Sequence, residues 1–473
     1  MLGKIRSIHF VGIGGIGMSG IAELLLNQGF IVSGSDLKET SVTRRLAELG
    51  TKVFIGHAAS NVQGAEVMVT SSAVSASNPE VLEAGRLGIP VIPRAEMLAE
   101  LMRLKFSVAI AGSHGKTTVT SMIAVMLTDA GLDPTAVIGG RLDVFGSSAR
   151  LGKGELMVAE ADESDRSFLL LLPSIAVVTN IDREHLDHYR DLDEIKDAFV
   201  SFMNKTPFYG AVIACSDPPW REAMESIRPR LRRRLITYGV EPGAAITAED
   251  IECHGKGSTF RVRESGKSSG RAFEIRLAVP GRHNVQNALA AVGVGLELGL
   301  SADQIRRGLE RFRGADRRFQ VKLEADGITV VDDYGHHPTE IRATLDAARS
   351  RGSKRIWAVF QPHRYSRTRA LMDDFAHAFA GCERVYVLDI YAASEEPIPG
   401  VTSRRLVERM RELGCAGARY APSEESVTSE ILTEAGPGLT LLTIGAGSVW
   451  RVADALASSL SELKTAQGAD GRG

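Results

Sequence analysis

Short apolar runs alternate with helix-like stretches along most of this chain of 473 residues. Strands that alternate with helices indicate parallel sheets with helices packed on both faces. The pattern therefore predicts an α/β protein built from three such segments. The predicted strands are residues 7–12, 30–33 and 66–71, then 106–111, 155–159 and 175–179, then 328–331, 355–360, 384–388 and 439–444, and two predicted helices are residues 18–28 and 119–127.

Length and charge narrow the class of protein further. A chain of this length exceeds what one hydrophobic core accommodates, which favours about three domains. We place them at residues 1–104, 105–313 and 314–473. The net charge of −2 gives no argument for a nucleic-acid or membrane partner, no apolar run approaches membrane-spanning length, and the four cysteines show no metal-binding spacing. We expect a soluble, cytoplasmic protein.

A strand, a glycine-rich turn and a helix follow one another over residues 106–127, and this order is the geometry that binds phosphate. In such a turn Lys116 reaches the terminal phosphates and the Thr117 hydroxyl ligates Mg²⁺. Only two residues separate the glycines, whereas the usual loop has four, and the alternative is a glycine-rich helix start with a surface lysine. We predict an ATP site formed by Gly112, Ser113, His114, Gly115, Lys116, Thr117 and Thr118.

A second glycine-rich turn follows the first predicted strand. Gly12, Gly14 and Gly17 fit the pattern G-x-G-x-x-G, and Asp36 lies about twenty residues later, where an acid accepts from a ribose hydroxyl. Alone, this pattern is typical of an NAD-dependent oxidoreductase. A UDP-sugar satisfies the same amides and the same acid, and hydride transfer has no need of a separate ATP loop. Both ligands stay open at this loop, with the ATP loop favouring the UDP-sugar.

Polar residues follow two of the predicted strands in the second segment. Glu160 follows one of them, and Asn180 and His185 follow the next. The carboxyl ends of parallel strands share one sheet edge, so these side chains are expected beside the ATP loop. Carboxylate and hydroxyl oxygens suit Mg²⁺, which phosphoryl transfer needs. We predict one or two Mg²⁺ ions near Thr117, and we expect most acids between residues 162 and 187 to be exposed.

Five motifs carry a family resemblance that covers nearly the whole chain, from about residue 7 to about residue 450. They are HFVGIGGIGMSG at residues 9–20, GSHGKTT at 112–118, EADESD at 160–165, DYGHHPTE at 333–340 and FQPHRYSRTR at 360–369. In this order they resemble the Mur ligases, and within that family most closely the branch that adds L-alanine.

The resemblance implies three domains: an N-terminal Rossmann-like domain for the UDP moiety, a central P-loop ATPase-type domain with a parallel sheet, and a C-terminal Rossmann-like domain for the amino acid. It implies a step of peptidoglycan precursor synthesis. In that step the carboxylate of UDP-N-acetylmuramate attacks the γ-phosphate of ATP, and the amine of L-alanine attacks the resulting acyl phosphate. The implied partners are UDP-N-acetylmuramate, L-alanine and ATP as substrates with Mg²⁺ as cofactor, no nucleic acid and no membrane, in a monomer or weak homodimer.

The resemblance also assigns roles by position. An arginine pair suits the carboxylate of an amino acid, because each guanidinium binds both oxygens. The implied roles are catalysis by Lys116, Glu160, His185 and His336; metal binding by Thr117, Glu160 and His185; ATP binding by residues 112–118 with Asn180, Asn287, Arg318 and Asp333; UDP-sugar binding by Gly14, Gly15, Gly17 and Asp36; and amino-acid binding by Tyr334, His336, Arg364 and Arg367.

Alternatives stay open at this point. A related ligase that attaches a recycled peptide to the same UDP-sugar would share the ATP loop. An NAD-dependent oxidoreductase would use the first loop, and a nucleotide-sensing switch would need the ATP loop without an amino-acid site. Outside their motif, Arg364 and Arg367 would be expected in surface ion pairs, and His336 near a helix start.

Overall fold

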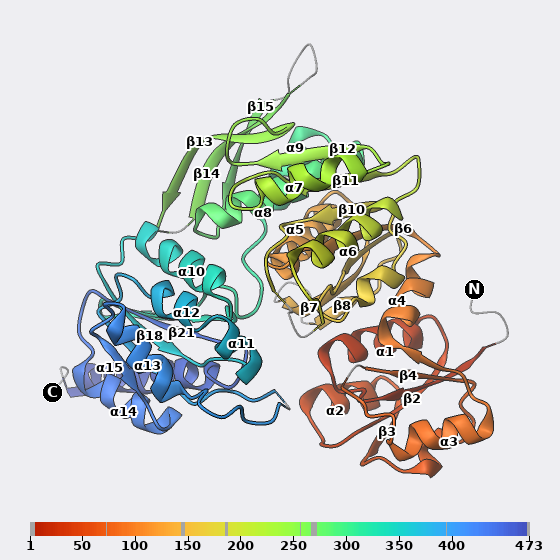
Figure 1. Cartoon of the computed structure of the whole chain (residues 1–473), viewed down its shortest axis with the longest axis horizontal. Helices are drawn as coiled ribbons and strands as arrows, with labels where there is room; N and C mark the ends of the chain where they lie inside the picture. Colours follow the sequence, from red (N-terminus) through yellow and green to blue (C-terminus); the bar gives the residue numbers. More distant parts are fainter. Residues whose placement is uncertain are drawn as a thin grey trace. The chain divides into compact units, whose positions relative to one another are not determined.

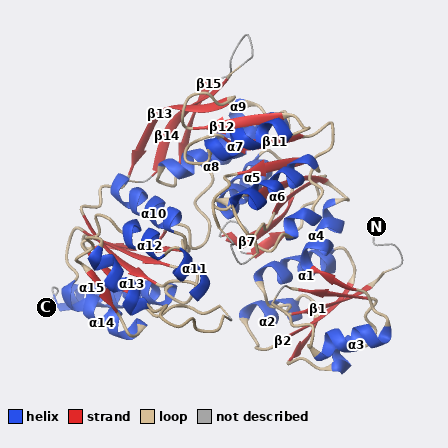
Figure 2. Ribbon diagram, viewed as in Figure 1, coloured by secondary structure: helices blue, strands red, loops and turns tan. Residues whose placement is uncertain are grey.

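Three β-sheets form the framework of the chain (Figure 1), and helices cover their faces (Figure 2). The computed structural model describes residues 5–71, 73–142, 147–184, 188–255, 257–265, 272–393 and 395–470. The three-domain α/β class predicted from the sequence is confirmed. By its internal contacts the chain forms two units, the first of Met1–Asp250, Phe260–Leu277 and Val285–Arg313, the second of Ile251–Thr259, Ala278–Asn284 and Gly314–Gly473. The domain boundaries after residues 104 and 313 stay predictions.

The N-terminal domain alternates strands and helices. Its elements are β1 (Ser7–Val11), α1 (Ile16–Asn27), β2 (Ile31–Asp36), α2 (Ser41–Glu48), β3 (Lys52–Ile55), η1 (Ala59–Val62), β4 (Val67–Thr70), α3 (Pro79–Leu87), β5 (Val91–Pro93) and α4 (Arg94–Met102). The sheet is parallel with the order β3-β2-β1-β4-β5. From β1 the chain adds β2 and β3 on one side of the sheet and then β4 and β5 on the other. The strand order therefore reverses beside β1, and the loop after β1 lies where open α/β sheets bind ligands.

The central domain is built on a ten-stranded sheet of order β15-β14-β13-β12-β11-β10-β6-β9-β7-β8. Its elements are β6 (Phe106–Ala111), α5 (Lys116–Asp129), β7 (Thr135–Leu142), β8 (Ser147–Arg150), β9 (Leu156–Glu160), η2 (Ser167–Leu170), β10 (Ile175–Val178), α6 (Leu192–Asn204), β11 (Ala211–Cys215), α7 (Arg221–Ile227), η3 (Arg228–Arg230), β12 (Leu235–Gly239), β13 (Ile246–His254), β14 (Gly257–Glu264), β15 (Ala272–Leu277), α8 (Arg282–Glu297) and α9 (Ala302–Glu310). β6 is buried from Ser107 onward and apolar from Val108 to Ala111, as expected of a strand covered on both faces.

The C-terminal domain has a six-stranded sheet of order β16-β17-β21-β18-β19-β20, parallel except for the edge strand β16. Its elements are β16 (Gln320–Ala325), β17 (Ile328–Asp333), α10 (Pro338–Ser350), β18 (Arg355–Phe360), α11 (Tyr365–Ala370), α12 (Met372–Ala378), β19 (Arg384–Val387), α13 (Ser403–Glu412), β20 (Ala418–Tyr420), α14 (Glu424–Glu434), β21 (Leu439–Ile444) and α15 (Trp450–Asp470). Along β18, Ile356 and Phe360 pack in one core while Trp357 packs in the other. This alternation places helices on both faces of the sheet.

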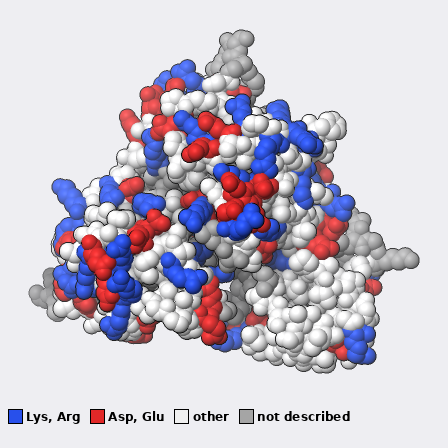
Figure 3. Space-filling model, in the orientation of Figure 1, with Lys and Arg blue, Asp and Glu red and all other residues white. Residues whose placement is uncertain are grey.

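The predicted elements are all present; β6, β18 and β21 have the predicted ends, and the others have shifted ends. The strand predicted at 30–33 continues to Asp36, and the helix predicted at 119–127 begins at Lys116. On the face drawn in Figure 3, basic and acidic side chains lie interspersed. Exposed ion pairs of this kind, such as Arg409 with Asp373, contribute about 0–1 kcal/mol each, so the buried sheets provide most of the stability. Among the described helices, none has the length and apolar character needed to cross a membrane.

Candidate active site

The strand order brings three strand ends together at the phosphate loop. β6 lies between β10 and β9 and runs parallel to both. Val178 at the end of β10 is level with Ala111 at the end of β6, and Glu160 at the end of β9 is level with Ile110. The residues that follow these strands therefore emerge at one sheet edge, as the sequence predicts.

Two glycines give the phosphate loop its shape. φ is +133° at Gly112 and +83° at Gly115, a region that residues with a Cβ rarely adopt. A Cβ on Gly112 would overlap the Thr179 hydroxyl, and a Cβ on Gly115 would lie 2.7 Å from Asn287 Oδ1. The loop thus runs directly against the end of β10 and against α8. Asn287 lies beside the loop, and its contact with ATP stays a prediction.

Residues after β10 hold the main chain of the loop by hydrogen bonds. The Asn180 side chain accepts from His114 N–H at 2.8 Å and donates to the His114 carbonyl at 3.0 Å. Thr179 donates to the same carbonyl at 2.5 Å. The Asp182 N–H donates to the Ser113 hydroxyl at 2.9 Å, and His114 Nε2 lies 3.0 Å from Asp182 Oδ2. Asn180 therefore positions the loop, while a direct contact with ATP stays a prediction.

Lys116, the first residue of α5, lies among carboxylates. Its Nζ donates to Glu163 Oε1 at 2.8 Å and to the Gly112 carbonyl at 2.7 Å. Burial lowers the pKa of Lys116, but nearby carboxylates, Glu163 foremost, outweigh burial and raise the pKa above its ordinary value. Lys116 is therefore a cation throughout the physiological pH range, placed at the loop that the sequence identifies.

Glu163 is a residue of this site that the sequence prediction leaves out. Its side chain is buried beside Lys116, and its carbonyl accepts from the Tyr189 hydroxyl at 2.7 Å. Glu184, in the second acidic run, is buried as well. Asp162, Asp165 and Asp182 are half-buried, so among the described acids of this range the expectation that most are exposed is wrong. The sequence EADESD does not indicate which of its carboxylates is buried, because burial depends on the pairing of Glu163 with Lys116, which is distant in sequence.

Thr117 and Glu160 form a pair of oxygen donors. The Thr117 hydroxyl lies 3.2 and 3.1 Å from the two carboxylate oxygens of Glu160. A hydroxyl and a carboxylate at one sheet edge, beside a phosphate loop, fit Mg²⁺, which prefers oxygen ligands and substrate phosphates. The third predicted ligand, His185, lies outside the described residues.

The first glycine-rich loop is closed onto the end of β2. The Gly12 N–H donates to the Ser35 carbonyl at 2.8 Å, and the Gly14 N–H donates to Asp36 Oδ2 at 2.8 Å. Gly15 is the N-cap of α1 and has no side-chain cap, and a Cβ on Gly17 would lie 2.6 Å from Arg94 Nη1. The loop and Asp36 thus lie together, as predicted, at the N-terminus of a helix that favours an anion.

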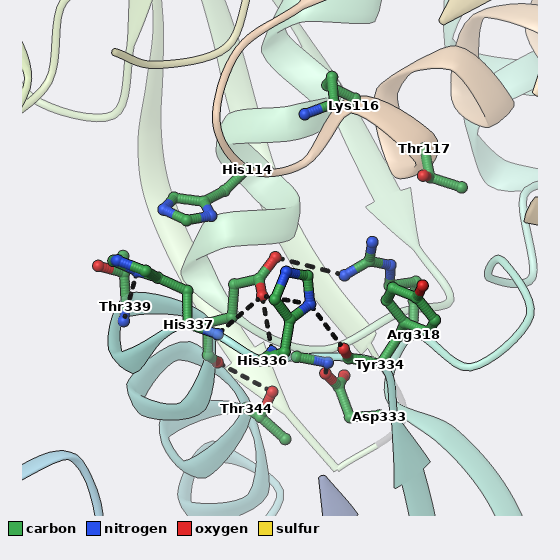
Figure 4. Close-up of polar contacts among 12 residues, drawn as sticks. His114, Lys116, Thr117, Arg318, Asp333, Tyr334, His336, His337, Thr339 and Thr344 are labelled. Atoms are coloured by element: carbon green, nitrogen blue, oxygen red, sulfur yellow. Dashed lines mark hydrogen bonds and ion pairs between the residues drawn. The ribbon is translucent and has the colours of Figure 1, made fainter. Parts of the chain in front are cut away.

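In the C-terminal unit, Asp333 holds the segment that carries Arg318. Its two carboxylate oxygens accept from the Phe319 and Gly335 N–H groups, each at 2.7 Å. Burial raises the pKa of Asp333 to about 6, against the lowering effect of Arg318. Arg318 lies 3.5 Å from Glu340 Oε1, and Figure 4 shows it beside Tyr334. The role of Arg318 and Asp333 toward ATP stays a prediction.

Aromatic rings gather where β17 and β18 end. The His336 ring lies 5.7 Å from the Tyr334 ring and 5.7 Å from the His363 ring, between centroids. Arg367 Nη1 lies 3.2 Å from His363 Nδ1. Burial, and then Arg367 and Arg364, lower the pKa of His363 to about 4, so this ring is neutral at physiological pH. The sequence predicts no role for His363, although this residue lies in the motif at residues 360–369.

The arginine pair flanks the start of α11. Arg364 directly precedes the helix with φ at +69°, and its guanidinium lies 4.0 Å from Glu395 Oε1. Arg367 lies one turn later, beside His363. Both follow β18 at the carboxyl edge of the sheet, where a ligand is expected. Their role as carboxylate ligands stays a prediction.

Three family models match the chain in order. The Mur ligase family catalytic domain matches residues 7–106, the Mur ligase middle domain residues 110–295, and the Mur ligase glutamate ligase domain residues 317–447. The chain belongs to the Mur ligase family. This membership confirms the resemblance that the motifs carry, and it decides against an oxidoreductase at the first loop.

Mur ligases similar to this chain match it over nearly the full length of both chains. A protein of Solibacter usitatus named UDP-N-acetylmuramate–L-alanine ligase is 55% identical, with 98% of this chain and 97% of the relative covered. A protein of Koribacter versatilis with the same name is 54% identical, with 98% and 100% covered. The crystal structure of UDP-N-acetylmuramate–alanine ligase from Thermotoga maritima is 29% identical, with a TM-score of 0.81 and 96% and 99% covered.

Proposed function

We propose that this Mur ligase joins L-alanine to the lactyl carboxylate of UDP-N-acetylmuramate and converts ATP to ADP and phosphate. The observation that carries the proposal is a half-buried lysine and a pair of oxygen donors at one phosphate loop, in a chain that matches alanine ligases over 98% of its length. Peptidoglycan precursor synthesis is the process that uses such a product, and we place the enzyme in the cytoplasm.

The reaction proceeds in two substitutions. A carboxylate is a poor electrophile until one of its oxygens becomes a good leaving group. One carboxylate oxygen therefore attacks the γ-phosphorus of ATP, the bond to the β-phosphate oxygen breaks, and ADP leaves. The amine of L-alanine then attacks the acyl carbon, phosphate leaves with that carboxylate oxygen, and the amine loses a proton. An amide, ADP and phosphate are the products.

The loop of the central domain performs the first substitution. Its N–H groups and the N-terminus of α5 bind the phosphates, and Lys116 holds the transferred phosphoryl group and offsets its charge. Thr117, Glu160 and His185 would hold Mg²⁺, which supplies further charge neutralisation on the phosphate oxygens when bound. To bind the phosphates, Lys116 exchanges its ion pair with Glu163 for contacts with the phosphate oxygens.

The other substrates bind at the two Rossmann-like domains. The loop at Gly14 to Gly17 and Asp36 bind the UDP moiety. In the C-terminal domain, Arg364 and Arg367 bind the carboxylate of L-alanine, which directs its amine away from them. His336 lies beside Tyr334 and accepts the proton that the amine loses.

One assay tests this proposal. The purified protein is incubated with Mg²⁺, ATP, UDP-N-acetylmuramate and single amino acids or peptides, and phosphate release is followed. We expect release only when UDP-N-acetylmuramate and L-alanine are both present, and loss of release when the metal is chelated. Phosphate release that is indifferent to the acceptor, or that requires a peptide in place of L-alanine, would contradict the proposal.

A further inference from the structure

A buried carboxylate lies beneath the first glycine-rich loop. Glu80, in the first turn of α3, has no exposed surface. Its Oε2 accepts from the Ser35 hydroxyl at 2.6 Å and lies 3.2 Å from His9 Nε2. Its Oε1 accepts from the Asn61 side chain at 2.6 Å and from the Ala58 N–H at 3.2 Å. One side chain thus joins β1, β2, and the start of η1 to α3.

Glu80 is ionised in this setting. Burial raises the pKa of a carboxyl, but the hydrogen bonds from His9, Ser35 and Asn61 outweigh burial and bring the pKa of Glu80 to about 2. An ionised carboxylate inside a domain is costly unless donors surround it. Here both oxygens are satisfied by donors, and two of those donors, His9 and Ser35, belong to strands β1 and β2, which end at the predicted ligand edge of the sheet.

Ser35 connects Glu80 to the loop. The hydroxyl of Ser35 donates to Glu80, while its carbonyl accepts from the N–H groups of Gly12 and Ile13 at 2.8 and 3.0 Å. The next residue, Asp36, accepts from Gly14. The position of Ser35 therefore sets where the first turn of the loop and the Asp36 carboxylate lie.

The same hydroxyl fixes the hydrogen-bond direction at a neighbouring histidine. His57 Nδ1 lies 3.0 Å from Ser35 Oγ, and the Ser35 proton is already committed to Glu80. His57 Nδ1 must therefore carry a proton and donate it to Ser35. In the neutral ring the other nitrogen, Nε2, is then an acceptor. His57 is the partly exposed end of this chain of hydrogen bonds, with 17% of its side chain exposed.

We propose that Glu80 is a positioning residue for the UDP-sugar: through Ser35 it fixes the N–H groups of the first loop, and it keeps His57 Nε2 as an acceptor at the ligand edge. The inference rests on the proposed function only in naming the UDP-sugar as the ligand of this loop. Glu80 itself touches no reacting atom.

Glu80→Gln is the informative change, because it keeps the shape of the side chain and reverses the donor and acceptor roles along the hydrogen bonds from Glu80 through Ser35 to His57. The Ala58 N–H can only donate a hydrogen bond. The amide oxygen of the glutamine therefore stays at the Oε1 position, and its NH₂ faces Ser35. The Ser35 hydroxyl must then accept from the amide and donate to His57 Nδ1, which moves the proton of His57 to Nε2. A purely structural role for Glu80 requires no such change of tautomer.

Calorimetric titration with UDP-N-acetylmuramate and, separately, with Mg²⁺ and a non-hydrolysable ATP analogue tests the inference on the full chain. We expect Glu80→Gln to weaken UDP-sugar binding about tenfold, the size expected for losing about one hydrogen bond between the domain and the ligand, with ATP-analogue binding unchanged. Histidine ¹⁵N shifts should show His57 protonated at Nδ1 in the wild type and at Nε2 in the variant. Glu83→Gln is the matched control, since Glu83 lies on the same helix in an exposed pair with Arg86.

Ser35→Ala provides the second arm and carries the test alone if Glu80→Gln does not fold. It cuts the link to the loop and leaves Glu80 its donors from His9, Asn61 and Ala58. Unchanged UDP-sugar binding in the folded variants would overturn the inference, as would an equal loss of ATP-analogue binding. A wild-type protein that does not bind UDP-N-acetylmuramate would instead overturn the proposed function.

Discussion

At the scale of single residues, the phosphate loop is governed by charge balance. Lys116 is largely withdrawn from solvent, with 14% of its side chain exposed, and such a cation is costly unless carboxylates surround it. Glu163 supplies the ion pair at 2.8 Å, and Glu160 and Asp162 add to the negative field. When the phosphates of ATP take Lys116, the carboxylates need other cations, which is a physical reason for the metal requirement that we propose.

Lys116→Met tests the division of labour between the domains. We expect turnover to fall by about a hundredfold or more, because a charge that stabilises the transferred phosphoryl group is lost. UDP-N-acetylmuramate binding, measured by calorimetry, should change less than about twofold, because it takes place at the first loop. Lys116→Met/Glu163→Gln is the control for stability, since it removes both members of the buried pair. Loss of UDP-sugar binding in the stable double variant would contradict the assignment.

Asp333 gives a prediction for the dependence of stability on pH. Burial raises its pKa from 3.8 to about 6, so the folded protein binds this proton more tightly than the unfolded chain does. The Asp333 contribution to the free energy of unfolding is therefore unfavourable above pH 6, and this penalty of about 3 kcal/mol disappears as the pH falls through 6 toward 4.

Denaturant unfolding at pH 7 and pH 4.5, in the wild type and in Asp333→Asn, checks this sign. The wild type should gain stability relative to the variant as the pH falls, because the asparagine does not titrate. A difference in unfolding free energy between the two proteins that is independent of pH, or that changes in the opposite direction, would show that the pKa of Asp333 is not raised.

At the scale of elements, the site depends on how closely the loop approaches its neighbours. β6 delivers the loop between β10 and β9, and the chain at Gly112 passes so near the end of β10 that a Cβ has no room. The positive φ at Gly112 adds to this restriction. The loop with the short spacing between its two glycines thus packs directly against the residues that follow β10.

Gly112→Ala should therefore reduce both stability and ATP binding. We expect a loss of roughly 2 kcal/mol in unfolding free energy and at least about a tenfold loss of ATP-analogue affinity. Gly131→Ala is the matched control, since Gly131 follows α5, has φ at +80° and would meet no atom within 4 Å. It should lose some stability and keep its affinity. Equal ATP binding by the two variants would contradict the packing argument.

The predictability of each feature follows from how local its signal is. β6, the loop and α5 are encoded in one continuous stretch, so the phosphate loop was predictable from sequence. The edge strand β16 was not predicted: apolar and polar residues alternate along it, but only three of its six residues are apolar and none is buried. The Lys116–Glu163 and Ser35–Glu80 contacts join residues more than 40 positions apart, and only the sheet order brings them together.

At the scale of the whole molecule, the reactants are assigned to different domains. The UDP moiety and the phosphate loop for ATP are assigned to the first unit, and L-alanine is assigned to the second unit, which also carries Arg318 and Asp333 with their predicted roles toward ATP. An acyl phosphate and an amine react only at near contact, so we expect the chain to become more compact when the substrates are bound. Closure also keeps water from the acyl phosphate.

Small-angle X-ray scattering of the full chain tests closure. The radius of gyration should fall when UDP-N-acetylmuramate and a non-hydrolysable ATP analogue with Mg²⁺ are both present, and each ligand alone serves as the control. Scattering curves that coincide with and without the ligand pair would contradict closure, and would require substrates that reach one another without domain movement.

The central claim is that ATP activates the carboxylate of UDP-N-acetylmuramate for attack by L-alanine. The most direct measurement uses UDP-N-acetylmuramate labelled with ¹⁸O at both lactyl carboxylate oxygens, with ATP, Mg²⁺ and L-alanine, and mass spectrometry of both products. We predict one ¹⁸O in each phosphate released and the other in the carbonyl of the new alanyl amide. Phosphate without label, or a product without the mass of alanine, would contradict the account.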